Sequence, residues 1–188
     1  MDNLIQLRDA VTRGHVPNFL FFWGHTPPKS GGAGKHCFSQ WHVAPFALNG
    51  QIYPSAEHAM MAAKARCFGD QVALEQILAA DTPKRAKELG RQVKGFDAAV
   101  WREAAFDAVV EANTAKFTQH PDLGALLVGT GVQVLVEASP VDPVWGIGLA
   151  EDHPHASQPL LWPGENGLGF ALMKVRRQLI GHGAAAQD

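Results

Sequence analysis

The segment 54–65, PSAEHAMMAAKA, joins a helix start to an almost unbroken run of small and apolar residues. Ser55 is a typical N-cap residue, and it places Glu57 in the first turn, where free N–H groups and the helix dipole favour a carboxylate. Alanines surround the few charged positions, so we expect this helix to be buried on most sides. Any fold of the chain must therefore cover this helix and still accommodate Glu57.

Glu57 and Lys64 share one face of the predicted helix, because they lie two turns apart. One acid and one base on a face that also carries methionines is typical of a half-buried cleft. The alternative is a core helix whose Glu57 and Lys64 side chains extend along it to reach water. The segment alone does not decide between the two.

The composition is that of a globular protein. The chain has 188 residues, of which 46% are hydrophobic and 18% are charged, and this length suits one domain with a single core. No segment approaches the roughly 20 apolar residues that span a bilayer, and residues 1–6 lack the pattern of a secretory signal. We therefore expect a cytoplasmic protein with no membrane partner.

The net charge and the positions of the cysteines restrict the binding partners and the cysteine chemistry that we expect. The formal net charge is −2, the isoelectric point is about 6.5, and no run of Lys or Arg is present. This balance argues against electrostatic binding to long nucleic acids or acidic membranes. Cys37 and Cys67 are outside any CxxC pattern, so we expect two free thiols.

Helix signals outnumber strand signals along the chain, which predicts an α+β fold: a mostly helical single domain with a small β-sheet. The core is expected over about 18–180, and 181–188 is expected to be a flexible tail. Asn49-Gly50 predicts a hairpin turn, and the Pro/Gly-rich segment 27–34 predicts a loop. The expected helices are 2–13, 71–80, 83–89, 98–118, 121–127 and 168–180, and the expected strands include 18–24 and 132–138.

Many short motifs occur together in one order along residues 18–180, and in that order the chain resembles the NADAR (YbiA-like) family. They are Ser39-Gln40-Trp41, Pro45-Phe46, Glu57-His58, Lys64, Gly90-Arg91, Trp101, Lys116-Phe117, Leu135-Val136-Glu137-Ala138, Asp142, Trp145-Gly146-Ile147-Gly148, Asn166-Gly167-Leu168-Gly169 and Leu172-Met173-Lys174-Val175-Arg176. No single motif is specific, but the set is.

The resemblance implies an N-glycosidase that cleaves the bond between a nitrogen and the anomeric carbon of a ribose phosphate or ADP-ribose. One branch of the family acts on early riboflavin-pathway ribosylamino-pyrimidine intermediates, which are our first expectation for the substrate. Another branch removes ADP-ribose from guanine bases, so ADP-ribosylated guanine or nucleic acid is the alternative partner. A module that only binds ADP-ribose or a nucleotide is the non-enzyme alternative.

The family's catalytic Glu, Trp and Asp fall on Glu57, Trp101 and Asp142. By the same resemblance, the expected substrate-binding residues are Ser39, Gln40, Lys64, Arg91, Trp145, Gly146 and Asn166. The chain departs from the family's commoner Ser-Asn-Phe motif at Gln40 and Trp41, the positions expected to affect recognition of the base.

The chemistry of the reaction gives an independent reason to single out these residues. Cleavage of an N-glycosidic bond passes through an oxocarbenium-like state, which requires a carboxylate near the anomeric carbon and a second acid or base. Glu57 and Asp142 are the candidates, although an Asp in a Pro-rich loop also suits an Asx-turn or a cap. Trp101 and Trp145 can stack on a base, or lie in the core like most tryptophans.

The phosphate requires cations or N–H donors. Lys64 and Arg91 supply charge, and the helix start at 164–167 can offer backbone N–H groups. Arg91 can equally be a surface residue that closes a glycine turn.

No metal or other cofactor is expected. Of the nine histidines, His153 and His155 have no Cys or acidic partner at the spacing of a zincin site, and His58 cannot share a helix face with the neighbouring Glu57. A Walker loop and a Gly-x-Ser-x-Gly nucleophile elbow are also absent from the sequence. The sequence thus predicts a metal-independent hydrolase of a small phosphorylated ribosyl compound.

Overall fold

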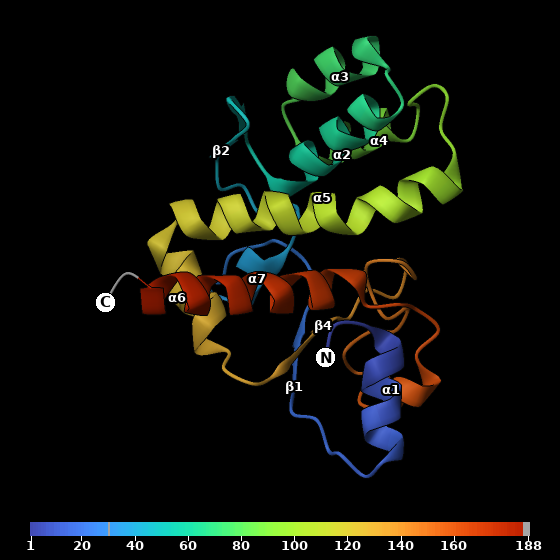
Figure 1. Cartoon of the computed structure of the whole chain (residues 1–188), viewed down its shortest axis with the longest axis vertical. Coiled ribbons are helices and arrows are strands. Elements are labelled where there is room, and N and C mark those ends of the chain that lie inside the picture. The colour runs from blue at the N-terminus through green and yellow to red at the C-terminus, as the bar shows by residue number, and fades with distance from the viewer. Residues whose placement is uncertain (30, 186–188) are drawn as a thin grey trace. The chain divides into compact units, whose positions relative to one another are not determined.

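The computed structural model describes residues 1–29 and 31–185, and it confirms the predicted α+β fold (Figure 1). The helices are α1 (Leu4–Thr12), α2 (Ala56–Cys67), α3 (Gln71–Leu78), α4 (Pro83–Gly90), α5 (Ala98–Gln119), α6 (Pro121–Gly129) and α7 (Gly167–Ala185), with 3-10 helices η1 (Lys35–Phe38) and η2 (Pro159–Leu161). The strands are β1 (Phe19–Phe22), β2 (Phe46–Leu48), β3 (Gln51–Tyr53) and β4 (Val134–Glu137).

The chain divides into two compact units, a division that the sequence analysis did not predict. The central unit is the continuous segment Gln40–Pro121. The terminal unit combines Met1–Ser39 with the chain from Asp122 on. Each unit contains one two-stranded sheet, and each is described separately below.

The central unit is built around α2. This helix packs against α3, α4 and α5 (Figure 1), so its small residues are covered on several sides, as the alanine content predicts. Strands β2 and β3 form an antiparallel hairpin whose turn residues Asn49 and Gly50 have φ angles of 52° and 78°. Positive φ at both central positions is the geometry that Asn-Gly favours, which explains the correctly predicted turn.

Local side-chain caps start the helices of the central unit. The side chains of Ser55, Asp70, Thr82 and Asp97 each accept a hydrogen bond from a backbone N–H in the first turn of α2, α3, α4 and α5 respectively. Such caps satisfy N–H groups that have no partner within the helix. The helix starts are therefore determined within a few residues of sequence.

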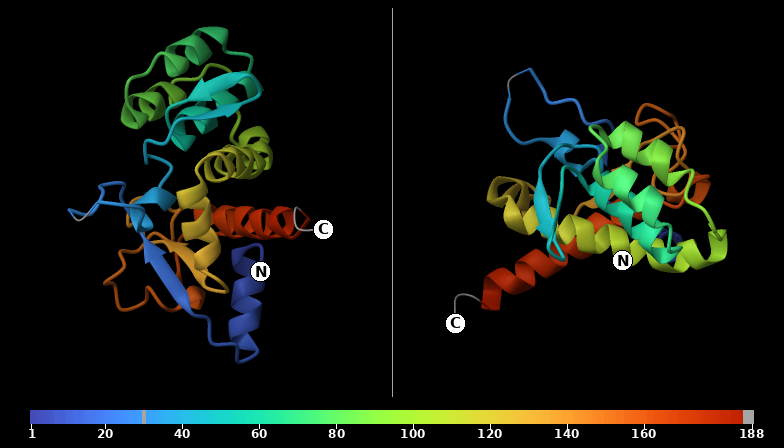
Figure 2. Two further views of the ribbon diagram at one scale, coloured as in Figure 1. Left: turned by 90° about the vertical axis from the view of Figure 1, so that its left-hand side faces the viewer. Right: turned by 90° about the horizontal axis from the view of Figure 1, so that it is seen from above.

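The terminal unit is held by a parallel pair of strands from distant parts of the chain. Strand β1 pairs with β4, with Phe19 opposite Val134 and Phe22 opposite Glu137, and both strands are seen side by side in Figure 2. Helix α7 packs on β4, and the approach is closest at Gly169, where an added Cβ would lie 2.1 Å from the Leu135 carbonyl oxygen. Glycine is required there because no side chain fits.

One sequence expectation differs from the structure near the C-terminus. Helix α7 continues to Ala185, so residues 181–185 are helical and are not the start of the expected tail. The helix predicted over 168–180 therefore extends through the sequence Gly-His-Gly-Ala-Ala. Residues 186–188 lie outside the described part of the chain, as does residue 30 of the predicted 27–34 loop.

Among the described residues, no helix combines the length and the apolar character needed to cross a bilayer.

Candidate functional site

Glu57 lies in the first turn of α2 with only 4% of its surface exposed. Its backbone N–H donates to the Gln40 carbonyl oxygen at 3.0 Å, so the segment at Gln40 is attached to the start of the helix. The carboxylate does not reach solvent as the core-helix alternative required. Glu57 is instead a buried acid in the first turn of α2, at the positive end of the helix dipole.

His58, next to Glu57, has no exposed surface and two hydrogen-bond partners. Its Nε2 lies 3.2 Å from the Ala80 carbonyl oxygen, which can only accept, so Nε2 carries the proton. Its Nδ1 lies 2.7 Å from Ser55 Oγ. Burial lowers the pKa of His58, and the neutral ring joins the start of α2 to the end of α3.

Lys64 and Arg91 lie close enough in the central unit for their charges to interact. Burial is the main cause that lowers the pKa of Lys64, and the positive charge of Arg91 lowers it further. The Lys64 ammonium lies 4.0 Å from the centroid of the Phe96 ring. Two neighbouring cations, one half-buried and one exposed, form a site that an anion would stabilise.

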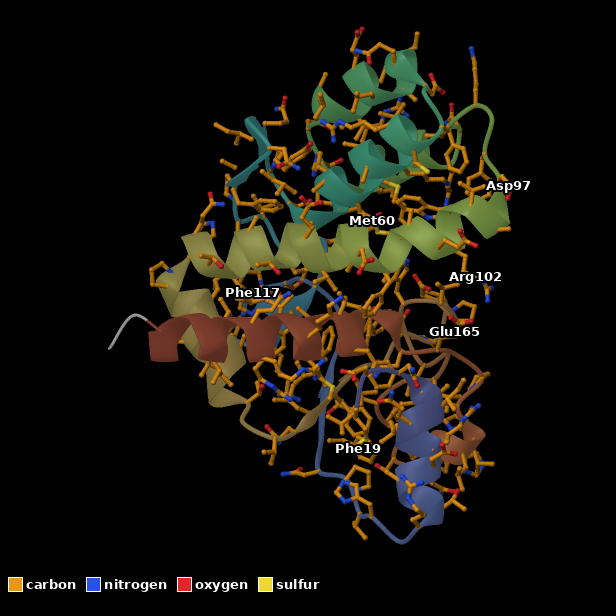
Figure 3. All side chains as sticks on the ribbon, viewed as in Figure 1. Phe19, Met60, Asp97, Arg102, Phe117 and Glu165 are labelled. Atoms are coloured by element: carbon orange, nitrogen blue, oxygen red, sulfur yellow. The ribbon has the colours of Figure 1, made fainter. Side chains whose placement is uncertain are left out.

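Trp101 occupies the first turn of α5, as the sequence predicts, and is half-buried. Asp97 caps this turn through bonds from the N–H groups of Ala99 and Val100, and it is labelled at the helix start in Figure 3. The cap fixes where the helix begins and hence where the indole is presented. The structure thus establishes the position and partial burial of Trp101, and its contact with a substrate base stays a prediction.

Two buried polar residues of α5 were not assigned to the site from the sequence. Asn113 and Lys116 are both fully buried, and they share a helix face because they are three residues apart. Asn113 donates to the side chain of Gln40 at 2.8 Å, and the Lys116 ammonium lies 5.0 Å from the Phe117 ring centroid. Polar residues at helical spacing among apolar neighbours were the available sequence signal.

In the terminal unit, Asp142 organises its own loop. Its Oδ1 accepts hydrogen bonds from the N–H groups of Val144 at 3.1 Å and Trp145 at 2.9 Å. Its carbonyl oxygen accepts from Gly146 N–H at 3.1 Å. This is the Asx-turn that was the alternative interpretation of Asp142, and it holds the carboxylate in one orientation.

Asn166 joins this loop to the sheet. It has a φ of 57°, its Oδ1 accepts from Glu137 N–H at 2.9 Å, and its Nδ2 donates to Leu135 O at 2.9 Å. Gly146 is equally constrained, because an added Cβ would lie 2.8 Å from Ser139 Cβ. Both residues bring the loop close to β4.

The helix start at 164–167 uses its backbone N–H groups within the protein. Those of Gly164, Glu165, Asn166 and Gly167 donate to carbonyl oxygens of Ile147, Pro143, Gly146 and Val144 respectively, at 2.8–3.1 Å. These groups were candidates for binding a phosphate. Because they are already bonded to the loop, they are not free to bind a phosphate in this structure.

Ser39 is buried and follows η1, in which two residues have metal-binding side chains. His36 Nε2 and Cys37 Sγ lie 3.3 Å apart, and Cys37 is a buried free thiol, as expected. Structural zinc sites use four protein ligands and catalytic ones three. The segment 36–42, which also carries His42, is where a metal would first be sought.

The candidate residues fall into two groups, one in each unit. The central unit brings Gln40 to Glu57 and Lys64 to Arg91, and it also carries Trp101. The terminal unit brings together Asp142, Trp145, Gly146 and Asn166, and it carries Ser39 at its boundary. None of these contacts assigns a chemical role by itself.

Comparisons with known proteins support the resemblance. The family model of the NADAR domain matches residues 21–180. The N-glycosidase R617 of Acanthamoeba polyphaga mimivirus is 42% identical over 165 residues, which are 85% of this chain and 95% of that protein. The N-glycosidase YbiA of Escherichia coli (strain K12) is 32% identical over 142 residues, 76% of this chain and 80% of the relative. The solution structure of Escherichia coli YbiA is similar with a TM-score of 0.69 and 28% identity, covering 90% of both chains.

Proposed function

Because this chain belongs to the NADAR family, we propose that it is an N-glycosidase, the activity for which its relatives are named. The proposed substrate is a small ribosyl compound with a phosphate, of which early riboflavin-pathway ribosylamino-pyrimidines are the first choice. The observation that carries the proposal is the buried carboxylate of Glu57, held at the start of α2 beside Gln40.

The proposed reaction is hydrolysis. The bond between the anomeric carbon and the nitrogen breaks, and its electron pair leaves with the nitrogen. The ribosyl group then carries positive charge, which the ionised Glu57 stabilises or neutralises by helping water to attack. The water oxygen bonds to the anomeric carbon and a proton passes to the departing nitrogen. No oxidant or reductant is required.

The phosphate of the substrate is assigned to Lys64 and Arg91. Their proximity is unfavourable without an anion, since each charge destabilises the other. A phosphate between or beside them would relieve that repulsion and form charge-assisted hydrogen bonds. In this proposal, the contact of the phosphate with Lys64 and Arg91 orients the ribosyl group, although the phosphate is not part of the bond that breaks.

The other predicted residues have supporting roles in the proposal. Trp101 is a flat surface for the base, and Asp142 is the second acid or base. Ser39, Trp145, Gly146 and Asn166 shape the substrate-binding side; of these, Gly146 and Asn166 act through the loop they hold to β4. Asp142→Asn tests the second acid, because an asparagine Oδ1 can still accept from Val144 and Trp145 while the charge is lost.

One screen tests the function. The purified protein is incubated with ribosylamino-pyrimidine phosphates and, separately, with ADP-ribosylated guanine, and the released base is detected by mass spectrometry. We expect release from the pyrimidine compounds. Release only from ADP-ribosylated guanine would replace the proposed substrate, and binding of ADP-ribose without any release would replace the enzyme by a binding module.

Glu57→Gln is the control for that screen. The amide keeps the size of the side chain but lacks the charge, so kcat should fall about 10²-fold or more, the scale for loss of a general base. The fold should persist, since the lost interaction with the helix dipole is worth only about 0.3–1 kcal/mol. A folded variant with normal turnover would remove Glu57 from the mechanism.

A further inference from the structure

The side-chain amide of Gln40 is held by Asn113, and the orientation of both amides follows from one backbone group. Asn113 has an amide atom 2.8 Å from the Val109 carbonyl oxygen, four residues earlier on α5. A backbone carbonyl oxygen can only accept, so this atom is Nδ2. Nδ2 is also the atom 2.8 Å from the Gln40 side chain, which must therefore present its oxygen, Oε1.

Within residues 1–29 and 31–185, this arrangement leaves the Gln40 Nε2 group without a strong acceptor. Its partner is the sulfur of Met60 at 3.5 Å, and a thioether is a weak acceptor (Figure 3 labels Met60 on α2). Gln40 is only 5% exposed, and its backbone carbonyl oxygen binds Glu57 N–H. A nearly unused N–H₂ donor thus lies on the residue that is attached to the start of the Glu57 helix.

Asn113 uses both of its N–H donors but not its oxygen. It is fully buried, and its Oδ1 has no hydrogen-bond partner among the described residues. An acceptor left in that state costs stability, and an apolar residue would avoid the cost. Both N–H donors, by contrast, are used at short distance.

We propose that Asn113 is a positioning residue that holds the Gln40 oxygen, so that Gln40 presents its N–H₂ donor to the substrate. The substrate atom bound by Gln40 is then a lone-pair acceptor: a carbonyl oxygen or ring nitrogen of the base, or an oxygen of the ribose. This inference rests on the proposed function and adds the polarity of recognition at residue 40.

The decisive variant is Gln40→Glu. A glutamate still accepts from Asn113 Nδ2 but has no donor when ionised, so the buried contact remains while the proposed bond to substrate is lost. We expect KM to rise about tenfold, the effect of one hydrogen bond, with kcat changed far less. Gln40→Met, which keeps the length without either polar atom, should raise KM equally and avoids a buried charge.

Asn113→Ala tests whether Asn113 acts through Gln40. It frees the Gln40 amide to rotate, so KM should rise, yet the double variant Gln40→Met/Asn113→Ala should have the KM of Gln40→Met alone. Thr114→Val is the matched control on the adjacent position of α5. Thr114 Oγ1, like the Asn113 amide, donates to the carbonyl oxygen four residues earlier, that of Val110, at 2.8 Å. The KM of Thr114→Val should be unchanged.

The outcomes separate the two proposals. A wild-type protein that releases no base from any ribosyl compound refutes the proposed function. A wild-type protein that turns over, with folded Gln40→Glu and Gln40→Met variants of normal KM, refutes only the donor at residue 40. Additive effects of residues 40 and 113 on KM refute the positioning role.

Inhibition by ribose 5-phosphate shows which part of the substrate carries the acceptor. If Gln40→Met raises the inhibition constant of ribose 5-phosphate, the acceptor lies on the ribose. If the inhibition constant is unchanged, the acceptor lies on the base.

Discussion

The burial of His58 makes the stability of this protein depend on pH. The pKa of His58 in the folded state lies below its ordinary value of about 6.5, because burial disfavours the charged ring. The unfolded chain therefore binds more protons as the pH falls below about 6.5. The contribution of His58 to stability is complete above that pH and is lost progressively below it, by at most about 1.4 kcal/mol per pH unit.

Urea unfolding between pH 8 and pH 5 measures this effect. The free energy of unfolding of the wild type should fall as the pH decreases through 6.5, and His58→Gln should show a smaller decrease over the same range. The comparison with the variant is needed because the other histidines and the carboxylates also titrate. Equal pH slopes for the two proteins would show that His58 is not responsible.

Arg91 should act in binding. If the phosphate is held equally in the ground and transition states, Arg91→Ala raises KM by more than it lowers kcat. Arg85→Ala is the control on α4, the helix whose C-cap is Arg91, because Arg85 lies on the surface with its Nη1 3.4 Å from Glu88 Oε2. Steady-state kinetics with a phosphorylated substrate give both constants. An unchanged KM in Arg91→Ala would remove Arg91 from the site.

Among the elements, α7 packs on β4 through a glycine that no side chain can replace without a clash. A Cβ at Gly169 would lie 2.1 Å from the Leu135 oxygen and about as close to both amide atoms of Asn166. Gly169→Ala must therefore push α7 away from β4 and break the hydrogen bonds from Asn166 that hold the Asp142 loop to β4. We expect a loss of about 2 kcal/mol or more in the free energy of unfolding, the range for overpacking and lost buried hydrogen bonds.

Gly129→Ala is the control for that substitution. Gly129 lies at the end of α6, and beyond its own helix backbone no heavy atom lies within 4 Å of the position that a Cβ would take. Alanine should be neutral there, or stabilising by about 0.5–1 kcal/mol, because it favours the helix. Denaturant unfolding gives the free energy of unfolding of both variants. It thus compares Gly169, where a side chain would clash, with Gly129, where it would not. Equal stability of the two would contradict the close-approach explanation.

At the scale of the whole molecule, the proposed chemistry uses only groups of the chain. Turnover should therefore be unchanged after prolonged treatment with a chelator and gel filtration. Loss of activity that returns with zinc or magnesium would contradict the mechanism. Cys37→Ser would then show whether the His36–Cys37 pair takes part in binding the metal.

Local capping explains which candidate residues the sequence could place in the fold. The positions of Glu57 and Trp101 in the first turns of α2 and α5 were predictable because each helix starts at a nearby cap, Ser55 and Asp97 respectively. Lys64 and Arg91 were chosen for charge, and their proximity became visible only in the structure. The only sequence signal for Asn113 was its helical spacing from Lys116 among apolar neighbours, and its contact with Gln40 became visible only in the structure.

The sequence by itself determined the helix starts, the Asn49-Gly50 turn and the family, because caps and turns are made by neighbours in the chain and a set of ordered motifs needs no coordinates. Only the tertiary structure decided the parallel pairing of β1 with β4, the bonds from Asn166 to β4 and the Gln40–Asn113 contact. In each of these, a polar group is satisfied by a partner far away in sequence. The choice of that partner depends on how the whole chain buries its apolar surface, which no local pattern records.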